Sequence, residues 1–520
     1  MNRPKLGIAC YTLAAAISAS SSLIVDSKKA RANELGVDSS SEIEGQGETE
    51  RELLKLKKFM QENGIKITLD KAIQRGIEKN PRLEETFDSI QQFEWQLIAA
   101  KRRWYPNLSL SNGTPFTGYQ WGTFVQNEYG MRGKNREDQI LREPLFVSDR
   151  SQSFVVQPGA TISWNFIEPT RSPDIQAVSE SLQQQKFLFA VSARNLILEI
   201  QRSYYRAQRS QQLIASFEEI LRINNKELRS LESQLLVSKS TVLDVAQQRA
   251  QLYSQLDQLI NYINEYIRET AELAALTAAP PGQLVVPAEP ASLQGEWTLP
   301  LSETLQRAIH RREEIKASLA AAQSASWRGV EAMKSYLPVI GLTSNGNLNF
   351  DNGFSNVPNG SDAGDSYRWQ RNWNANAGIG FTWSIFDGGI RAAESESFDA
   401  QSNSLAAQAE QEELQAIRQV ESSYSLLQTS KLGVLSSQKA YENAYLAQEV
   451  ARVRHSVGLG DITTVVQTMG QLARASAQVA NATLDYNNSV AELYRYSATW
   501  PKNTEKRLET RTRKLREEGQ

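Results

Sequence analysis

Residues able to do catalytic or metal chemistry are few and scattered along the chain. Its 520 residues include two histidines, His310 and His455, which lie far apart and are interpreted as polar positions on helix surfaces. The carboxylate pairs Glu313-Glu314 and Glu412-Glu413 lie in charge-rich helical segments and are interpreted as solvated faces. The sequence holds no glycine-rich phosphate loop with a lysine and no HExxH motif. We therefore expect no enzyme activity, no metal and no cofactor.

The composition excludes two further classes of protein. Mean hydropathy is −0.47 and hydrophobic residues make up 40% of the chain, which argues against a helical-bundle membrane protein. The formal net charge is −2, whereas a nucleic-acid-binding protein would carry clustered basic charge. No nucleic-acid partner is expected.

The N-terminal segment has the pattern of a signal peptide. Arg3 and Lys5 precede an apolar run, and Ala30-Arg31-Ala32 fits the small-x-small cleavage rule, so residues 1–32 are predicted to be removed. An uncleaved membrane anchor is the alternative, because the run is about long enough to span a bilayer. Cleavage would also remove Cys10, the only cysteine, and leave no disulfide.

The rest of the chain repeats itself. The segment LDKAIQRGIEKNPRLEE from Leu69 matches LSETLQRAIHRREEIKA from Leu301, and VSKSTVLDVAQQRAQL from Val237 matches VGLGDITTVVQTMGQL from Val457. Each copy is predicted to run helix, strand, strand, helix, helix. The copies are placed at residues 66–279 and 301–500, with a flexible leader at 33–65, a linker at 280–300, and a charged tail at 501–520 that is expected to be solvated or disordered.

Four segments alternate between apolar and small polar residues. They lie at about 105–125 and 152–167 in the first copy, and at about 337–351 and 373–387 in the second. In the last of them Ile379, Phe381 and Trp383 share one face of a strand, and glycine, serine and threonine share the other. The length, the uncharged polar face and the tryptophans near the strand ends favour strands that cross a membrane. A soluble antiparallel sheet with one wet face is the alternative.

The helical segments are too long for one small domain. Residues 174–279 contain no glycine or proline, and residues 390–457 contain only Gly433. Apolar residues recur at steps of three and four, as in a coiled coil: Ile417, Val420, Tyr424, Leu427 and Val434. Sixty helical residues would reach about 90 Å. Such helices need neighbours, and four strands cannot close a barrel alone, so a cyclic oligomer is expected.

The sequence resembles the TolC family of outer-membrane efflux and secretion channels over nearly all of residues 66–500. The resemblance rests on YPNLSLSNG, YLPVIGLTSNG, WSIFDGGIRA and HSVGLGDITTVVQT. It implies a mainly helical fold with a membrane β-barrel. A homotrimer would form a twelve-stranded barrel in outer-membrane lipid, joined to a twelve-helix coiled-coil tunnel in the periplasm. The tunnel would dock a periplasmic adaptor and an inner-membrane transporter, making a passive exit duct for small molecules or proteins.

The resemblance also implies roles for particular residues. Asp387, Gly388 and Gly389 would form the strand–helix junction, which must differ in the first copy because Glu168-Pro169 stands there. Val457, Gly458 and Leu459 would form the adaptor-docking tip; a plain turn with a buried leucine is the alternative.

The tunnel entrance would lie a few residues beyond each tip. The family often carries a ring of aspartates there, and the matching positions in this sequence are Thr464 and Gln467 in the second copy, with Asp244 and Gln247 in the first. Asp244 and Asp461 lie near enough to supply one carboxylate ring, although capping of a helix N-terminus is the alternative role for both.

A protein of another class would also explain part of the sequence. A secreted periplasmic coiled-coil scaffold without a membrane-spanning barrel accounts for the helices. It does not account for four alternating strands with tryptophans near their ends.

Overall fold

The computed structural model describes residues 51–60, 62–112, 118–134, 140–357 and 364–518. The chain divides into two units, Met1–Asn63 and Gly64–Gln520. In the first unit, residues 51–60 are helical. The predicted signal peptide and most of the predicted leader lie outside the described residues. The second unit contains both repeats.

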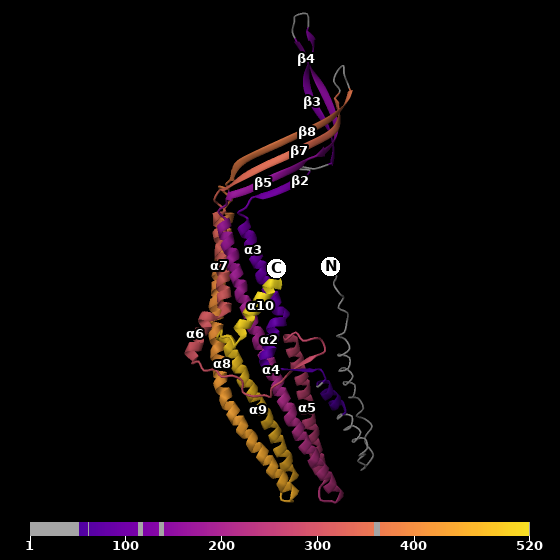
Figure 1. Ribbon diagram of the computed structural model, residues 1–520, viewed down its shortest axis with the longest axis vertical. Coiled ribbons are helices and arrows are strands. Elements are labelled where there is room, and N and C mark those ends of the chain that lie inside the picture. The colour runs from indigo at the N-terminus through magenta and orange to yellow at the C-terminus, as the bar shows by residue number, and fades with distance from the viewer. Residues whose placement is uncertain (1–50, 61, 113–117, 135–139, 358–363, 519–520) are drawn as a thin grey trace. The chain divides into compact units, whose positions relative to one another are not determined.

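The helices occur in two matching sets (Figure 1). Helices α2 and α3 are followed 232 positions later by α6 and α7, and α4 and α5 end 220 positions before α8 and α9. The bounds are α2 Leu69–Lys79, α3 Pro81–Arg102, α4 Arg171–Leu236, α5 Val242–Leu276, α6 Leu301–Arg311, α7 Glu313–Lys334, α8 Ile390–Ser456 and α9 Ile462–Tyr496. Among the described residues, none of the helices combines the length and the apolar character needed to cross a membrane.

A coiled-coil seam joins α8 to α9. The buried residues of α8 recur at alternating steps of four and three: Ala416, Val420, Ser423, Leu427, Ser430, Val434 and Ser437. Leu427 and Val434 pack in one cluster with Tyr486, Val490 and Leu493 of α9. The serine and alanine positions allow the two backbones to approach closely, and the leucine and valine positions bury apolar area. The predicted coiled-coil pattern is therefore confirmed on this helix.

The strands form one antiparallel sheet of six (Figure 1). Their bounds are β2 Asn107–Asn112, β3 Gly118–Lys134, β4 Ile140–Val156, β5 Pro158–Ile167, β7 Val339–Val357 and β8 Gly364–Thr382. Strands β4 and β5 both pair with β7 on one side. On the other side, β4 pairs with β3 and β5 pairs with β2. The sheet therefore has four long rows, with β8 at one edge, and as described it is open rather than closed into a barrel.

The strands reach farther into the loops than the sequence indicated, and one of them ends earlier. Strand β8 was expected to continue to about residue 387, but its ladder ends at Thr382. Its partner β7 begins at Val339, which pairs with Thr382, so the residues beyond have no strand to bond with.

Three segments outside the repeats are more ordered than expected. β1 (Gly64–Ile67) pairs in parallel with β6 (Leu284–Pro287), so parts of the predicted leader and linker form a second small sheet. The linker also buries Trp297. The tail was expected to be solvated or disordered, and this is wrong for α10 (Thr504–Glu518), because Leu508 and Leu515 lie in the main core with α2, α3 and α4.

Candidate functional site

The two hairpin tips have the same backbone conformation. At the second tip the N–H groups of Gly458 and Leu459 donate to the carbonyls of His455 and Arg454 at 2.9 Å each, and Gly458 has φ +76°. At the first tip Ser238 and Lys239 make the equivalent bonds, and Ser238 has φ +57°. The first tip therefore lies where the repeat alignment places it, although a serine takes the left-handed position that usually favours glycine.

The tips present apolar side chains to solvent. Val457 is 62% exposed and Leu459 is 72% exposed, and Leu236 and Val237 are also exposed at the first tip. The alternative of a plain turn with a buried leucine is therefore wrong for Leu459. Leu459 and Gly460 border a groove of about 580 Å³ between α8 and α9, which Leu446, Val450 and Arg454 also line.

Asp244 caps the helix that follows the first tip. Its carboxylate accepts hydrogen bonds from the backbone N–H of Thr241 at 2.8 Å and from the Thr241 hydroxyl at 2.7 Å, and that hydroxyl in turn accepts from the Asp244 N–H. These bonds from Thr241 hold the pKa of Asp244 below its usual value. Capping is thus the observed role of this residue.

The other predicted entrance residues lie in different environments. Asp461 occupies the position before the first residue of α9, is exposed, and makes no side-chain capping bond. Thr464 and Gln467 are also exposed, whereas Gln247 is half-buried. Among the described residues, no hydrogen bond or ion pair joins Asp244 to Asp461. Only Asp461 and Thr464 are brought to one surface, since both line the groove beside the second tip.

His455 has a position that the sequence did not indicate. It was interpreted as a helix-surface residue, but its side chain is only 13% exposed. Its Nδ1 lies 3.1 Å from the carbonyl oxygen of Gly460, and its Nε2 lies 3.8 Å from Oε1 of Glu227 on α4. His455 therefore lies between the two hairpins near their tips, and its Nε2 makes no hydrogen bond within the described residues. The other histidine, His310, is exposed as expected.

The second strand–helix junction is held by a cluster of aromatic, acidic and basic side chains. The indole N–H of Trp383 donates to the carbonyl of Tyr336 at 2.8 Å, and the Tyr336 hydroxyl donates to Asp387 at 3.0 Å. The Arg391 guanidinium lies 5.4 Å from the centre of the Tyr336 ring and 3.6 Å from the Asp387 carboxylate. We call these four residues the second junction clamp.

The turn inside this clamp requires glycine. Gly388 and Gly389 have φ +73° and +87°, which residues with a side chain rarely adopt. The Asp387 carboxylate accepts hydrogen bonds from the backbone N–H groups of Gly389 and Arg391 at 2.9 and 3.1 Å. It thereby satisfies N–H groups at the N-terminus of α8. Burial acts to raise the pKa of Asp387, but these N–H groups, Tyr336 and Arg391 outweigh it and leave that pKa lowered.

The first junction shares the indole–carbonyl bond and the arginine–ring contact, without the glycines. The indole N–H of Trp164 donates to the carbonyl of Trp104 at 2.9 Å, and the Arg171 guanidinium lies 4.5 Å from the centre of the Trp104 ring. Arg171 also pairs with Glu168 at 2.7 Å. The junctions differ in the turn, which is one residue shorter between the acid and the arginine, and in the bonds of the acid. Asp387 accepts from the Tyr336 hydroxyl and from two backbone N–H groups, whereas Glu168 bonds only Arg171 among the described residues. Trp164, Trp104, Glu168 and Arg171 form the first junction clamp.

Glu313 and Glu314 were interpreted as a solvated face, and this is wrong. Glu313 pairs with Arg194 of α4 at 2.9 Å, and Glu314 bonds Arg312 and Arg495. These side chains are largely buried because the start of α7 packs between α4 of the first repeat and α9 of the second repeat. Among the described residues, no group of three His, Cys, Asp or Glu side chains is arranged to hold a metal ion.

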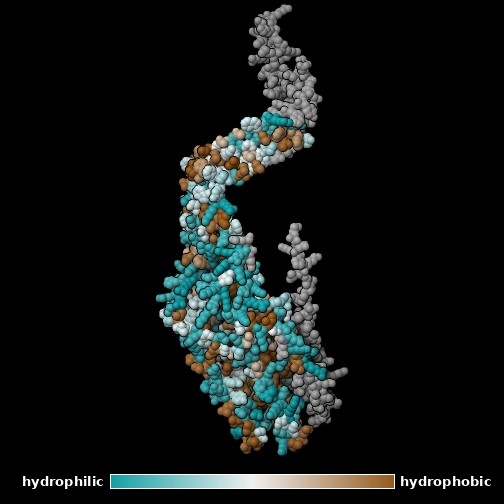
Figure 2. Space-filling view, in the orientation of Figure 1, coloured by the Kyte–Doolittle hydropathy of each residue, from teal (hydrophilic) through white to brown (hydrophobic). Residues whose placement is uncertain are grey.

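The sheet leaves its apolar side chains uncovered. Ile379 and Phe381 are each 73% exposed, and Leu110 on β2 is 80% exposed. On β8 every residue whose side chain is described is exposed, on both faces. In Figure 2 hydrophobic side chains are visible along the strand region and at the ends of the hairpins. Apolar surface of this extent marks contact with a membrane or with other chains.

Comparisons with known proteins agree with this arrangement. The family model described as outer membrane efflux protein matches residues 72–279 and 304–499. A comparison with curated protein sequences gave no match. Among solved structures, the Campylobacter jejuni CmeC outer membrane channel aligns with a TM-score of 0.65 at 15% identity, covering 85% of this chain and 89% of CmeC.

Two further structures are similar. The outer membrane protein VceC from Vibrio cholerae aligns with a TM-score of 0.60 at 16% identity over 83% of this chain and 96% of VceC. The open state of the Neisseria gonorrhoeae MtrE outer membrane channel aligns with a TM-score of 0.60 at 16% identity over 83% of this chain and 89% of MtrE. At these identities the similarity establishes a shared fold.

Proposed function

Because the chain belongs to the outer membrane efflux protein family, we propose that three copies assemble into one passive duct through which small molecules or proteins leave the cell. The protein is a TolC-like outer-membrane efflux protein, and its long helices form a periplasmic extension. In the proposed assembly the four strand rows of each copy join into a twelve-stranded barrel. The two hairpins of each copy join into a twelve-helix tunnel.

The observation that carries the proposal is the open sheet with an exposed apolar face. Its edge strands leave backbone N–H and C=O groups unpaired, which lipid does not tolerate. Pairing β8 of one copy with β2 and β3 of the next would satisfy both edges and turn the apolar face toward lipid. A soluble scaffold would instead have to cover Ile379, Phe381 and their neighbours with protein, and the described residues do not do so.

The helices support the same assembly. Near its C-terminal end, α8 carries a second apolar stripe, separate from the seam with α9. Its residues recur at steps of four, three and four: Leu446, Val450, Val453 and Val457. All four side chains are about half exposed or more. This stripe has coiled-coil spacing, and a hairpin of a neighbouring copy would bury it.

The hairpin tips are the proposed docking point for a periplasmic adaptor that connects the duct to an inner-membrane transporter. Helix α8 begins at the junction clamp and runs 67 residues to Ser456, so its tip lies about 100 Å from the strands. At the tip itself, exposed Leu459 and Val457, the last residue of this stripe, offer the apolar contact that an adaptor would bury. Asp461, Thr464 and Gln467 would then line the entrance.

Membrane association and oligomeric state test the proposal together. Cells are fractionated, the outer membrane is washed with alkaline carbonate, and the retained protein is treated with a crosslinker. Retention in the membrane together with crosslinking to a trimer is the expected result. Release into the wash with periplasmic proteins would mean that the strands form a soluble sheet, and the scaffold function would replace the duct.

A further inference from the structure

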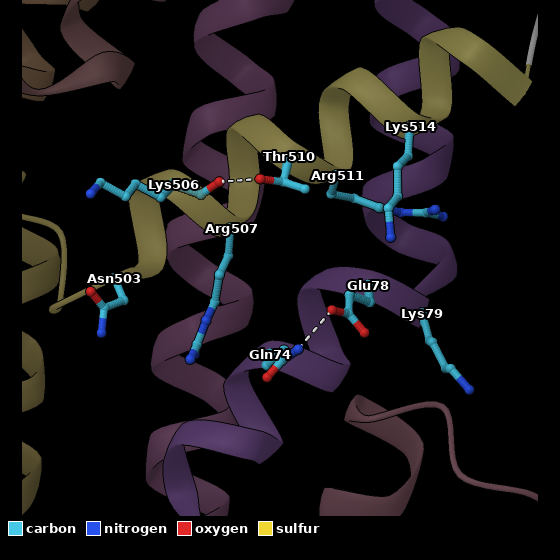
Figure 3. Close-up of a pocket in the computed structure, with 9 residues that line it drawn as sticks. All are labelled: Gln74, Glu78, Lys79, Asn503, Lys506, Arg507, Thr510, Arg511 and Lys514. Carbon is cyan, nitrogen blue, oxygen red and sulfur yellow. Dashed lines mark hydrogen bonds between the residues drawn. The ribbon is translucent and has the colours of Figure 1, made fainter.

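A cationic cavity between α2 and α10 is not used by the proposed duct. Its volume is about 580 Å³, within the range of ligand-binding pockets. Five cationic side chains and one carboxylate line it, although the whole chain has a formal net charge of −2. Figure 3 shows the lining residues: Gln74, Glu78 and Lys79 on α2, and Asn503, Lys506, Arg507, Thr510, Arg511 and Lys514 from the α10 region.

Two arginines of this cavity are fixed in place by carboxylates. The Arg507 guanidinium binds both oxygens of Asp70, at 2.8 and 2.7 Å, and Figure 3 shows its side chain extending from α10 toward α2. Arg511 lies 3.9 Å from Glu84. Because Leu508 and Leu515 anchor α10 in the main core, the cationic face has a rigid base. Within the chain, the arginines of this cationic face therefore already bind carboxylates, those of Asp70 and Glu84.

The lysines of the cavity have no such partner. Within the part of the chain that the structure describes, the ammonium groups of Lys79, Lys506 and Lys514 form no ion pair, and all three side chains are exposed. The single carboxylate of the lining, Glu78, accepts a hydrogen bond from Gln74 at 2.9 Å.

The spacing of these cations points to an extended ligand. Lys506 and Lys514 are eight helical residues apart, which separates them by about 12 Å along α10. In an extended peptide, side chains on one face recur every second residue, so three such carboxylates span about 13 Å. A single small anion would meet only one end of this row.

We propose that this cavity binds an acidic polypeptide segment, in extended conformation, through its side-chain carboxylates. Lys506, Lys514 and Lys79 supply the charge. The Asn503 amide can donate to a peptide carbonyl, and the Thr510 hydroxyl, which donates to the carbonyl of Lys506, can accept from a peptide N–H. Arg507 and Arg511 keep α10 in position against α2. The ligand is a partner protein's acidic segment, docked at the level of the core and not at the hairpin tips.

Fluorescence anisotropy on the full chain in detergent tests this proposal. The probe is a labelled Glu-Ser repeat peptide, with the Gln-Ser repeat as the uncharged control. The variant Lys506→Ala/Lys514→Ala should weaken binding of the Glu-Ser peptide about tenfold, the effect of losing two exposed ion pairs. The matched variant Lys502→Ala/Arg513→Ala removes the same charge near the same helix but outside the cavity, and should bind as the unaltered chain does.

Several outcomes would overturn the proposal. Equal weakening by the two variants would mean that the peptide senses only general positive charge. Absence of binding to the unaltered chain would remove the site. Competition by tripolyphosphate at lower concentration than the peptide would identify a phosphate ligand instead. A thermal unfolding midpoint shared by both variants excludes loss of α10 as the cause of weaker binding.

Discussion

Acidic residues occupy different repeat positions at the two hairpin tips and make different contacts, since Asp244 aligns with Thr464 and Asp461 aligns with Thr241. Asp244 uses its carboxylate to bind Thr241 and start α5, whereas Asp461 leaves its carboxylate out of any capping bond at the start of α9. In a trimer, the three Asp461 carboxylates would therefore be available to the entrance, and the three from Asp244 would be held by their own helices. The entrance of this protein is expected to be only weakly acidic.

The capping role of Asp244 predicts a pH dependence. Its folded-state pKa lies below the unfolded value of about 3.9, so its ionised form stabilises the fold above that pH. This stabilisation is lost as the pH falls through the folded-state pKa. Thermal unfolding of the chain and of Asp244→Asn, compared from neutral pH to about pH 3, should show a gap in midpoint that narrows below about pH 4. A gap that stays constant across this range would contradict the capping role.

The ion pairs at the start of α7 predict a larger effect. Glu314 bonds Arg312 and Arg495, both of which are buried. Glu314→Ala would leave two buried guanidinium groups without their shared carboxylate, so we expect a loss of about 3 kcal/mol in the free energy of unfolding. Denaturant unfolding in detergent measures it. Glu410→Ala, at an exposed position of α8, is the control and should change the free energy by less than about 0.5 kcal/mol. Similar losses in both would show that the pairs are solvated after all.

At the scale of elements, the two junction clamps explain how a strand can pass directly into a long helix. Each clamp binds an indole N–H to a backbone carbonyl beside the preceding helix and places an arginine over an aromatic ring. The start of each long helix is thereby tied to the end of α3 or α7. The angle between sheet and hairpin is then set by side-chain contacts as well as by the chain itself.

The seam between α8 and α9 allows a prediction for a single position. Leu427 is fully buried against α9, while its neighbour Leu426 points outward and is 41% exposed. Leu427→Ala should lower the free energy of unfolding by about 3 kcal/mol, because it removes apolar contact and leaves a cavity. Leu426→Ala makes the same chemical change on the outer face and should cost less than half as much. Denaturant midpoints of the two variants decide it, and a larger loss for Leu426 would place the seam on the wrong face.

Local spacing determines which of these elements could be predicted. The seam positions were predictable because their pattern repeats within one helix, and the four strands because alternation needs only adjacent residues. The first junction clamp was not, because strands β2 to β5 lie between Trp104 and Arg171 in the sequence. The burial of Leu508 and Leu515 was also not predictable. They lie in a tail rich in charged residues, and they are buried only because α2 and α3 pack against it. The burial of His455 could not be predicted, because its neighbour Glu227 lies on the other hairpin and is far away in the sequence.

At the scale of the whole molecule, a single chain leaves apolar surface uncovered on its sheet and on its helical hairpins. The sheet exposes apolar side chains and two open edges, and the hairpins expose a second stripe of coiled-coil spacing. In the proposed trimer, the addition of neighbouring chains around a common axis would cover both surfaces. Barrel closure and tunnel closure should therefore depend on each other.

This dependence predicts the effect of a charge in the α8 stripe. Val450 is 48% exposed in a single copy and would be buried between copies, so Val450→Asp should place an unpaired carboxylate in the interface and prevent trimer formation. The hairpin itself should stay folded, because Val450 lies outside the seam with α9. Gln438→Asp introduces the same carboxylate at an exposed polar position of α8 and should leave the trimer intact. Crosslinking and size-exclusion chromatography in detergent report the oligomeric state, and circular dichroism reports the helices. If Val450→Asp still forms trimers as readily as Gln438→Asp, the stripe faces the periplasm or a partner, and the copies must meet through another face of the hairpins.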